Sequence, residues 1–192
     1  FQMLKDLRRT RSKTLGVPPF VIFQDPSLKD MANQYPVTLQ ELEQVQGVSK
    51  GKAKRYGKEF VKLISDYVEE NNIERPTDFV LKSVANKSAK KVFLIQNIDR
   101  KIPLDQIARS REIELEDLLK EIEGIVDSGT KLNVDYYINE LLDEEQQDII
   151  YDYFYDAETD DIELALSVLS DYGFEPHEIQ VMRIKFISDL GN

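Results

Sequence analysis

Apolar residues recur every three to four positions through most of the chain, which is the spacing that one face of an α-helix requires. Prolines, glycines and small polar residues interrupt this pattern at intervals and mark the ends of the helices. The chain is therefore predicted to be all-α. The expected helices cover about residues 1–15, 25–34, 38–45, 50–70, 87–97, 103–110 and 113–126, and four more follow between residues 130 and 192.

The longest predicted helix, at residues 50–70, has one apolar face and one cationic face. At about 100° per residue, its aromatic and aliphatic side chains fall within a single arc. The opposite side carries Lys50, Lys54, Arg55, Lys58 and Lys62. Gly47 allows a tight turn before the helix, and Ser49 is a good N-cap. A helix end with free N–H groups and positive charge favours phosphate, although a cationic face can also serve only to keep a helix in solution.

A second cationic stripe is predicted on the helix at residues 1–15, where Lys5, Arg9 and Lys13 follow one another at intervals of four. Arg8 and Arg11 fall nearer the apolar side of this helix. Because their aliphatic stems pack well on apolar surface, we expect both side chains to reach water or to pair with carboxylates.

Residues 17–23 combine two prolines with four large apolar side chains. Pro18 and Pro19 predict an extended or tightly turned path with no helix. Two interpretations of the apolar residues stay open. Either all four fill the core, or the ring of Phe20 remains at the surface and stacks on a nucleobase.

Charge is distributed unevenly along the chain, whose formal net charge is −11. Residues 1–73 carry +3, residues 74–129 carry −1, and residues 130–192 carry −13. A polyanion responds to the local field, within about 8–10 Å at physiological salt. The first third of the chain therefore favours nucleic acid, although the total charge does not.

A resemblance to the HRDC domain of RecQ DNA helicases and ribonuclease D rests on two segments. They are Val17-Pro18-Pro19-Phe20-Val21-Ile22-Phe23-Gln24-Asp25, and Gly47-Val48-Ser49 with Lys52, Arg55, Tyr56, Gly57 and Phe60 after it. The resemblance implies that residues 1–73 form a small helical bundle that binds DNA weakly. It also implies roles for Lys52 and Arg55, which match basic positions of the family. Phe20 stands where bacterial RecQ members often have a tyrosine implicated in single-strand contact.

The residues expected to contact single-stranded or structured DNA combine this resemblance with the charge pattern. They are Lys5, Arg9, Lys13, Phe20, Lys50, Lys52, Lys54, Arg55 and Lys58.

Residues 71–78 read as a linker, and residues 74–192 are expected to form a second helical domain. Within it, residues 86–128 look like a helix-turn-helix unit. Its second helix carries many carboxylates, which repel phosphate, so we expect the unit to serve as a scaffold. The cluster of Lys87, Lys90 and Lys91 is an alternative contact for the DNA backbone. Val92, Phe93 and Ile95 are expected to be buried.

Residues 130–192 are acidic with regular apolar spacing, and they resemble the helical tail that follows HRDC in some bacterial RecQ helicases. Three interpretations of the acidity stay open. It repels DNA from one side, it engages a basic protein, or it only confers solubility.

No catalytic motif is found in the sequence. Gly51-Lys52 is followed by Ala53, so no phosphate loop with its magnesium-binding hydroxyl is present. The chain has no cysteine and one histidine, His177, which argues against a transition-metal site. We therefore expect no cofactor here, and ATP and Mg²⁺ are expected in a separate motor domain. The chain begins with Phe1, which suggests a piece of a longer protein.

The favoured hypothesis is a C-terminal accessory DNA-binding region of a bacterial RecQ-type ATP-dependent DNA helicase. A cytoplasmic, nucleoid-associated protein is expected, since no membrane-spanning segment or disulfide pattern is seen. The alternatives are the HRDC-bearing tail of a ribonuclease D-like exonuclease and an acidic module that docks a protein partner.

Overall fold

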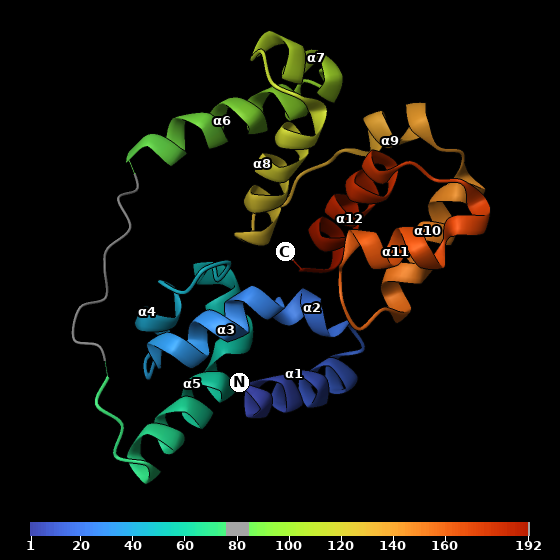
Figure 1. Ribbon diagram of the computed structural model, residues 1–192. Coiled ribbons are helices and arrows are strands. Elements are labelled where there is room, and N and C mark those ends of the chain that lie inside the picture. Colours follow the sequence, from blue (N-terminus) through green and yellow to red (C-terminus); the bar gives the residue numbers. More distant parts are fainter. Residues whose placement is uncertain (76–84, 192) are drawn as a thin grey trace. The chain divides into compact units, whose positions relative to one another are not determined.

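The computed structural model describes residues 1–75 and 85–191, which are helical with no strand, as the apolar spacing predicted (Figure 1). It divides into two compact units, Phe1–Ser83 and Val84–Asn192. Part of the predicted linker, residues 76–78, lies outside the described residues. Of residues 85–88 only the backbone is described. No helix in the described ranges combines the length and apolar content that crossing a membrane requires.

The first unit is a bundle built around one long helix. Its helices are α1 (Gln2–Leu15), α2 (Pro19–Ile22), α3 (Asp25–Gln34), α4 (Leu39–Leu42) and α5 (Lys50–Glu70). Phe23 and Phe60 meet edge to face at the centre of its core, with ring centroids 4.9 Å apart. Edge-to-face packing of this kind adds about 0.5–1.5 kcal/mol to the burial of the rings.

Helix α2 corrects the expectation that residues 17–23 contain no helix. Pro18 is extended, at φ −56° and ψ 147°, because the residue before a proline is held out of the helical region. Pro19 then occupies the first position of the helix, where the missing N–H group would have had no partner. The two prolines therefore start a one-turn helix.

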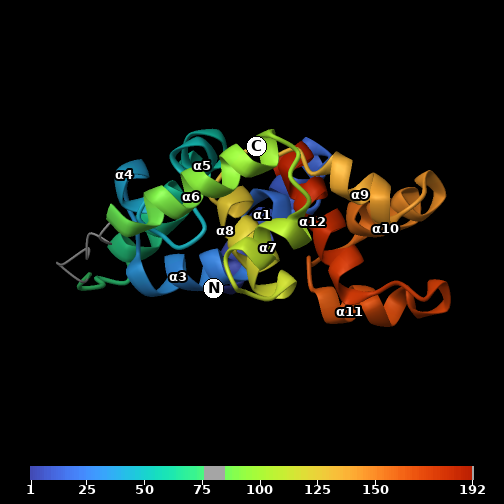
Figure 2. The same ribbon diagram turned by 90° about the horizontal axis from the view of Figure 1, so that it is seen from above.

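The second unit is organised around its last helix. Its elements are α6 (Ala85–Asp99), α7 (Leu104–Ser110), α8 (Leu115–Asp127), α9 (Asp135–Leu141), α10 (Glu144–Asp156), α11 (Ile162–Val168), the 3-10 turn η1 (Ser170–Tyr172) and α12 (Pro176–Gly191). Eight of the 16 residues of α12 are buried. Helix α12 packs against α8, α9, α10 and α11, so it forms the core of this unit (Figures 1 and 2).

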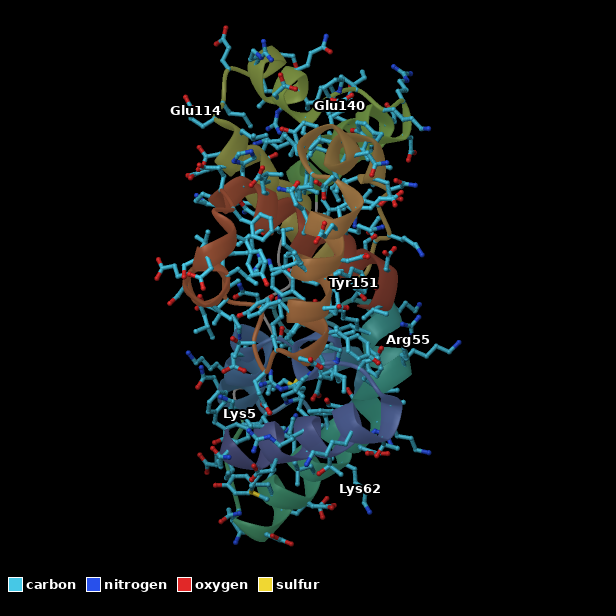
Figure 3. The ribbon with its side chains drawn as sticks, turned by 90° about the vertical axis from the view of Figure 1, so that its right-hand side faces the viewer. Lys5, Arg55, Lys62, Glu114, Glu140 and Tyr151 are labelled. Atoms are coloured by element: carbon cyan, nitrogen blue, oxygen red, sulfur yellow. The ribbon has the colours of Figure 1, made fainter. Side chains whose placement is uncertain are left out.

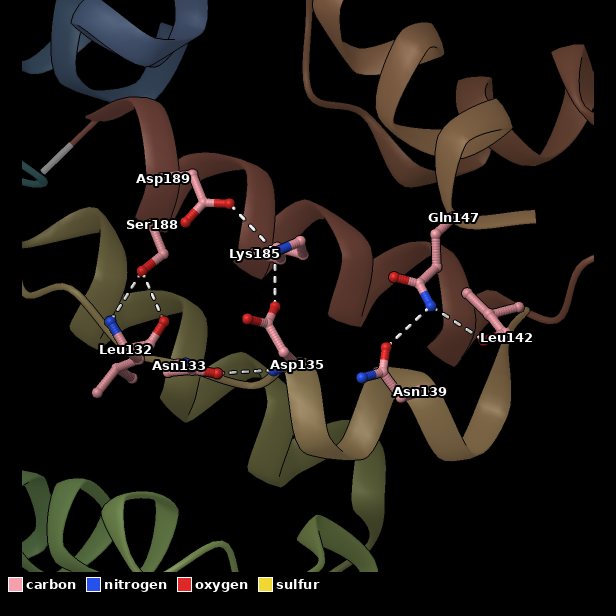
Figure 4. A network of polar contacts seen from close by, with 9 residues as sticks. All are labelled: Leu132, Asn133, Asp135, Asn139, Leu142, Gln147, Lys185, Ser188 and Asp189. Atoms are coloured by element: carbon pink, nitrogen blue, oxygen red, sulfur yellow. Dashed lines mark hydrogen bonds and ion pairs between the residues drawn. The ribbon is translucent and has the colours of Figure 1, made fainter. Parts of the chain in front are cut away.

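Polar side chains of α12 tie the surrounding segments to it (Figure 4). The hydroxyl of Ser188, which is fully buried, donates to the carbonyl of Leu132 and accepts from its N–H, both at 2.8 Å. Lys185 Nζ lies 2.6 Å from Asp135 Oδ1 and 3.3 Å from Asp189 Oδ2. These contacts fix the start of α9 against α12.

Helix α6 buries a different face from the one predicted. Val92 and Phe93 are 47% and 41% exposed, whereas Leu94 and Ile98 are each only 1% exposed. Leu94 and Ile98 stand one turn apart and define the inner side, which leaves the two preceding residues outside. The expectation that Val92 and Phe93 are buried is therefore wrong.

Candidate nucleic-acid interface

The turn before α5 is fixed by contacts to α3. Gly47 has φ 72°, and a Cβ atom there would lie 2.7 Å from Ser27 Oγ. The Ser27 hydroxyl donates to the carbonyl of Gln46 at 2.7 Å, and the N–H of Gln46 donates to Asp30 at 2.8 Å. Glycine suits this position because it adopts positive φ without strain and leaves room for the serine.

The start of α5 has the predicted cap. The backbone N–H of Lys52 donates to Ser49 Oγ at 3.1 Å. Further along, Gly57 lets α4 approach the helix closely, because a Cβ atom at Gly57 would lie 2.4 Å from Leu42 Cδ2. Helix α5 is thus held at its first turn and again two turns later.

A row of exposed cations follows the outer side of α5. Its members, which we call the α5 cation row, are Lys50, Lys54, Arg55, Lys58 and Lys62. Figure 3 shows Arg55 and Lys62 projecting outward from this helix, whereas Lys5 lies on the other side of the unit. Four of the five positions repeat every four residues, which sets them one turn apart along the helix. The row therefore concentrates positive charge on one strip of surface.

Lys52 does not belong to this row. It is 3% exposed, so the expectation that it faces solvent as a phosphate ligand is not met. The physical reason is its register, since Lys52, Tyr56 and Phe60 follow one another at intervals of four on the buried side of α5. This spacing is visible in the sequence, and it could have been used to predict that Lys52 is buried.

Helix α1 presents only part of its predicted stripe. Arg9 and Lys13 are exposed. Lys5 lies 2.9 Å from Asp25 and also stands over the ring of Phe1, 5.2 Å from its centroid. Because its charge is matched by a neighbouring carboxylate, Lys5 contributes less to the external field than Arg9 and Lys13 do.

Arg8 and Arg11 pair with carboxylates, as predicted. Arg8 is 5% exposed, donates to the carbonyl of Phe23 at 2.6 Å and lies 2.7 Å from Asp25. Arg11 lies 3.2 Å from Glu59 and so ties α1 to α5. Partial burial raises the pKa of Asp25, but hydrogen bonds from Lys5 and Arg8 outweigh it and hold that pKa below its ordinary value.

Phe20 is 2% exposed, and the three apolar residues after it are buried as well. The interpretation in which its ring stays at the surface is therefore not met, and the alternative in which all four fill the core agrees with the structure. Burial of a phenylalanine side chain is worth about 1.5–3 kcal/mol, which favours this outcome.

The exposed side of α8 is acidic. Glu114, Glu116 and Asp117 are exposed on it, and Glu114 is marked in Figure 3. Glu121 accepts two hydrogen bonds from Arg111, at 2.5 and 3.1 Å, and these bonds are the main cause of its lowered pKa. A helix with this surface repels the phosphates that border a major groove.

A groove of about 560 Å³ lies between α6 and α8. Three lysines and one carboxylate line it, with Leu94, Ile125 and Ser128 among the other residues: Lys90, Lys91, Lys120 and Glu121. Lys91 Nζ donates to the hydroxyl of Ser128 at 3.1 Å. Of the predicted basic cluster, Lys90 and Lys91 thus meet at a groove, and the side chain of Lys87 lies outside the described residues.

Within residues 1–75 and 85–191, no group of three or more metal-ligating side chains is found. The α5 cation row gathers exposed cations, and Lys90, Lys91 and Lys120 gather at the groove between α6 and α8, so both places are candidates for an anionic ligand.

Comparisons with known proteins match two separate stretches of the chain to two family models. The family model of the HRDC domain matches residues 1–64, and the model described as RecQ-1-like, helix-turn-helix domain matches residues 88–138. Over 67 residues the chain is 39% identical to the ATP-dependent DNA helicase RecQ of Bacillus subtilis and 33% identical to that of Haemophilus influenzae. These matches cover 35% of this chain and 11% of each helicase. The chain thus carries both domains and is distantly homologous to bacterial RecQ helicases over part of its length.

Proposed function

We propose that this chain is a C-terminal accessory DNA-binding region of a RecQ-type ATP-dependent DNA helicase, which tunes how the enzyme engages DNA in replication, recombination and repair. ATP and Mg²⁺ would act in a motor domain, because these 192 residues contain no phosphate loop. The role of this region would be to hold DNA rather than to carry out chemistry on it.

The α5 cation row is the observation that carries the proposal. Its members are exposed on a helix of the HRDC domain, and Arg9 and Lys13 on α1 add to the positive charge of this unit. Contacts of this kind go to phosphate and carry no sequence information. Non-specific binding by a handful of such contacts has a dissociation constant of about 10⁻⁴–10⁻⁶ M at physiological salt, which suits an accessory domain.

The second unit would contribute a smaller contact. The acidic side of α8 does not suit the major groove, whereas Lys90, Lys91 and Lys120 gather around one groove. The helix-turn-helix unit would then touch the DNA backbone through α6 and the adjacent side of α8. Its second helix would act as a scaffold for that contact.

The alternative of a ribonuclease D-like exonuclease receives less support. An HRDC domain suits either enzyme, but the match at residues 88–138 is to a RecQ-1-like domain, and the matching curated proteins are helicases.

A salt-dependent titration tests the proposal. Lys50→Gln, Lys54→Gln and Lys58→Gln are combined in one variant, and fluorescence anisotropy follows its binding to a labelled single-stranded oligonucleotide. Loss of three phosphate contacts should flatten the slope of log Kobs against log salt concentration by about 2, since each contact contributes about 0.7 on a single strand.

A matched control separates this row from total charge. Arg100→Gln, Lys101→Gln and Lys131→Gln remove three exposed cations from the second unit. The proposal expects this variant to keep most of the slope. Equal losses in the two variants would show that net charge matters and the α5 cation row does not.

A further inference from the structure

Three apolar side chains stand exposed in succession on α11 and η1. Leu164 is 50% exposed, Val168 is 58% exposed and Tyr172 is 57% exposed. Leu164 and Val168 lie one helical turn apart, and Tyr172 follows four residues later in the 3-10 turn. We call these three residues the α11 apolar stripe.

The core of the second unit does not use this stripe. Helix α11 packs on α12 through another side, where Ala165 and Leu169 are 0% and 6% exposed. Figure 2 shows α11 at an outer edge of the second unit. The Tyr172 ring stacks on that of Phe174, which is buried, with centroids 5.8 Å apart and planes inclined by 18°. The stripe is therefore an exposed apolar surface that ends in an aromatic ring held in place by stacking.

The surroundings of the stripe are negatively charged. Residues 132–182 contain 15 aspartates and glutamates and no lysine or arginine. Glu163 and Asp171, both exposed, lie on the same segment as the stripe. The next cations toward the C-terminus are already paired, since Arg183 lies 2.5 Å from Glu123 and Lys185 lies 2.6 Å from Asp135. The carboxylates beside the stripe therefore keep an uncompensated negative field.

We propose that the α11 apolar stripe docks a cationic amphipathic helix of a partner protein. Apolar side chains of that helix would cover Leu164, Val168 and the Tyr172 ring, and lysines or arginines on its flanks would face Glu163 and Asp171. This is the mode in which a helix presents anchors one turn apart to an apolar surface. Charge complementarity would speed the encounter and select against acidic helices.

The negative charge around the stripe also argues against other binding partners. DNA and anionic lipid surfaces are repelled by a segment that carries −13 over residues 130–192. A second copy of the same stripe would bring Glu163 and Asp171 against their own counterparts, which is destabilising. A cationic protein helix is the class that satisfies both the apolar and the charged parts of the surface.

This inference does not depend on DNA binding, because it concerns a different unit and an oppositely charged surface. A chain that fails to bind DNA can still bind the helix, and the reverse also holds.

Three synthetic 18-residue peptides serve as probes for the full 192-residue chain. The first is an amphipathic helix of leucine, alanine, glutamine and lysine, with the leucines on one side. The second has the same composition in scrambled order, so that its leucines surround the helix. The third replaces each lysine of the first with glutamate. Isothermal titration calorimetry in the absence of DNA measures the affinity of each peptide.

The variant Leu164→Ser/Val168→Ser removes two of the three apolar residues of the stripe without changing charge. Its control is Val92→Ser/Phe93→Ser, which removes two exposed apolar residues from α6. A single substitution at such an exposed site usually changes stability by about 0.5 kcal/mol or less, and thermal unfolding verifies that both variants fold.

The proposal expects the first peptide to bind most tightly and the glutamate peptide not to bind. The stripe variant should weaken binding of the first peptide about tenfold, equivalent to about 1.4 kcal/mol, while the control leaves it unchanged. Equal binding of the amphipathic and scrambled peptides would show attraction by charge alone and would overturn the proposal. So would unchanged affinity in the stripe variant, or failure of the first peptide to bind.

Discussion

The two units use their charges in opposite ways. In the first, Asp25 and Glu59 are drawn into pairs with Arg8 and Arg11, while the α5 cation row is left outside. In the second, Arg183 and Lys185 of α12 are drawn into pairs with carboxylates from other segments. Most of the acidic residues of its last third therefore remain on the surface.

The comparison shows that the charge that each unit presents to solvent depends on which of its charged side chains form ion pairs within the unit. In each unit a few charges of the scarcer sign cross-link segments, as Glu59 does with Arg11 and Arg183 does with Glu123. A net charge of −11 for the whole chain hides this division. The first unit thus suits a polyanion, and the acidic tail suits a polycation.

The largest effect is expected at Arg183. Arg183→Met removes the cation that faces Glu123, whose side chain is 12% exposed, and that also pairs with Asp160, whose side chain is 17% exposed. Removal of one member of a fully buried pair costs about 3–5 kcal/mol, because the remaining charge is uncompensated, and this largely buried pair should approach that range. Urea denaturation followed by circular dichroism measures the loss. Lys120→Met is the control, because Lys120 and its partner Asp117 are both 63% exposed, and a change above about 1 kcal/mol there would contradict this account.

Gly57→Ala is expected to have the next largest effect. The new Cβ atom would lie 2.4 Å from Leu42 Cδ2 and 3.0 Å from Leu39 Cδ2, so α4 must shift away from α5. Such overpacking costs about 1–3 kcal/mol. At Gly51, in the same helix, the new atom would meet only Ser49 Oγ, at 3.7 Å. Gly51→Ala should therefore be neutral or stabilising by up to about 1 kcal/mol. Thermal unfolding of both variants measures the difference, and equal losses at both glycines would count against the close approach of α4.

Asp25→Asn tests how much the ion pairs of this carboxylate stabilise the first unit. The variant removes the negative charge that Arg8 and Lys5 share. The free energy of unfolding should fall by about 1–2 kcal/mol, because the buried guanidinium of Arg8 is left with a weaker acceptor. Since the pKa of Asp25 is lowered in the folded state, its stabilising effect is present above pH 3.8 and is lost as the pH falls through the folded value. Urea midpoints between pH 6 and pH 2 should show a smaller acid-induced loss in the variant, and identical pH profiles would refute this role.

A smaller effect is expected in the second unit at alkaline pH. The hydroxyl of Tyr136 donates to the carbonyl of Ile102 at 2.7 Å, and burial raises the pKa of Tyr136 to about 12. The folded state keeps this proton longer than the unfolded chain, so stability should fall as the pH rises from 10 towards 12. Tyr136→Phe should cost about 0.5–1.5 kcal/mol at neutral pH and should reduce that alkaline loss. Chemical denaturation at pH 7 to 11 measures both, and a variant with the full alkaline loss would exclude Tyr136 as its source.

Local chemistry allowed much of the fold to be predicted. Gly47, Ser49 and the apolar spacing of α5 depend on neighbours in the sequence, and the structure confirms the turn, the cap and the helix. Burial was harder to predict, because it depends on which segments meet in space. The apolar run of α6 did not reveal that Val92 and Phe93 would face outward.

The same difference between local pattern and tertiary contact applies to the residues of the candidate site. The cations on the outer side of α5 were recognised from their spacing, since that side is opposite the apolar arc. Lys52 was assigned from the resemblance, and Phe20 from its apolar segment together with the resemblance, and both are buried in this structure. The partners of Arg8 and Arg11 lie 17 and 48 positions away in the sequence, so only the tertiary structure identifies them.

An NMR titration of the full chain with a short single-stranded oligonucleotide tests the central claim most directly. The amide signals of Lys50, Lys54 and Lys58 should shift as DNA is added, and 0.5 M salt should reverse the shifts, because the contacts are ionic. The signals of Leu164 and Val168 should stay in place. Shifts that cluster on the acidic side of α8 or on the α11 apolar stripe, with α5 unchanged, would contradict the assignment of DNA to the first unit.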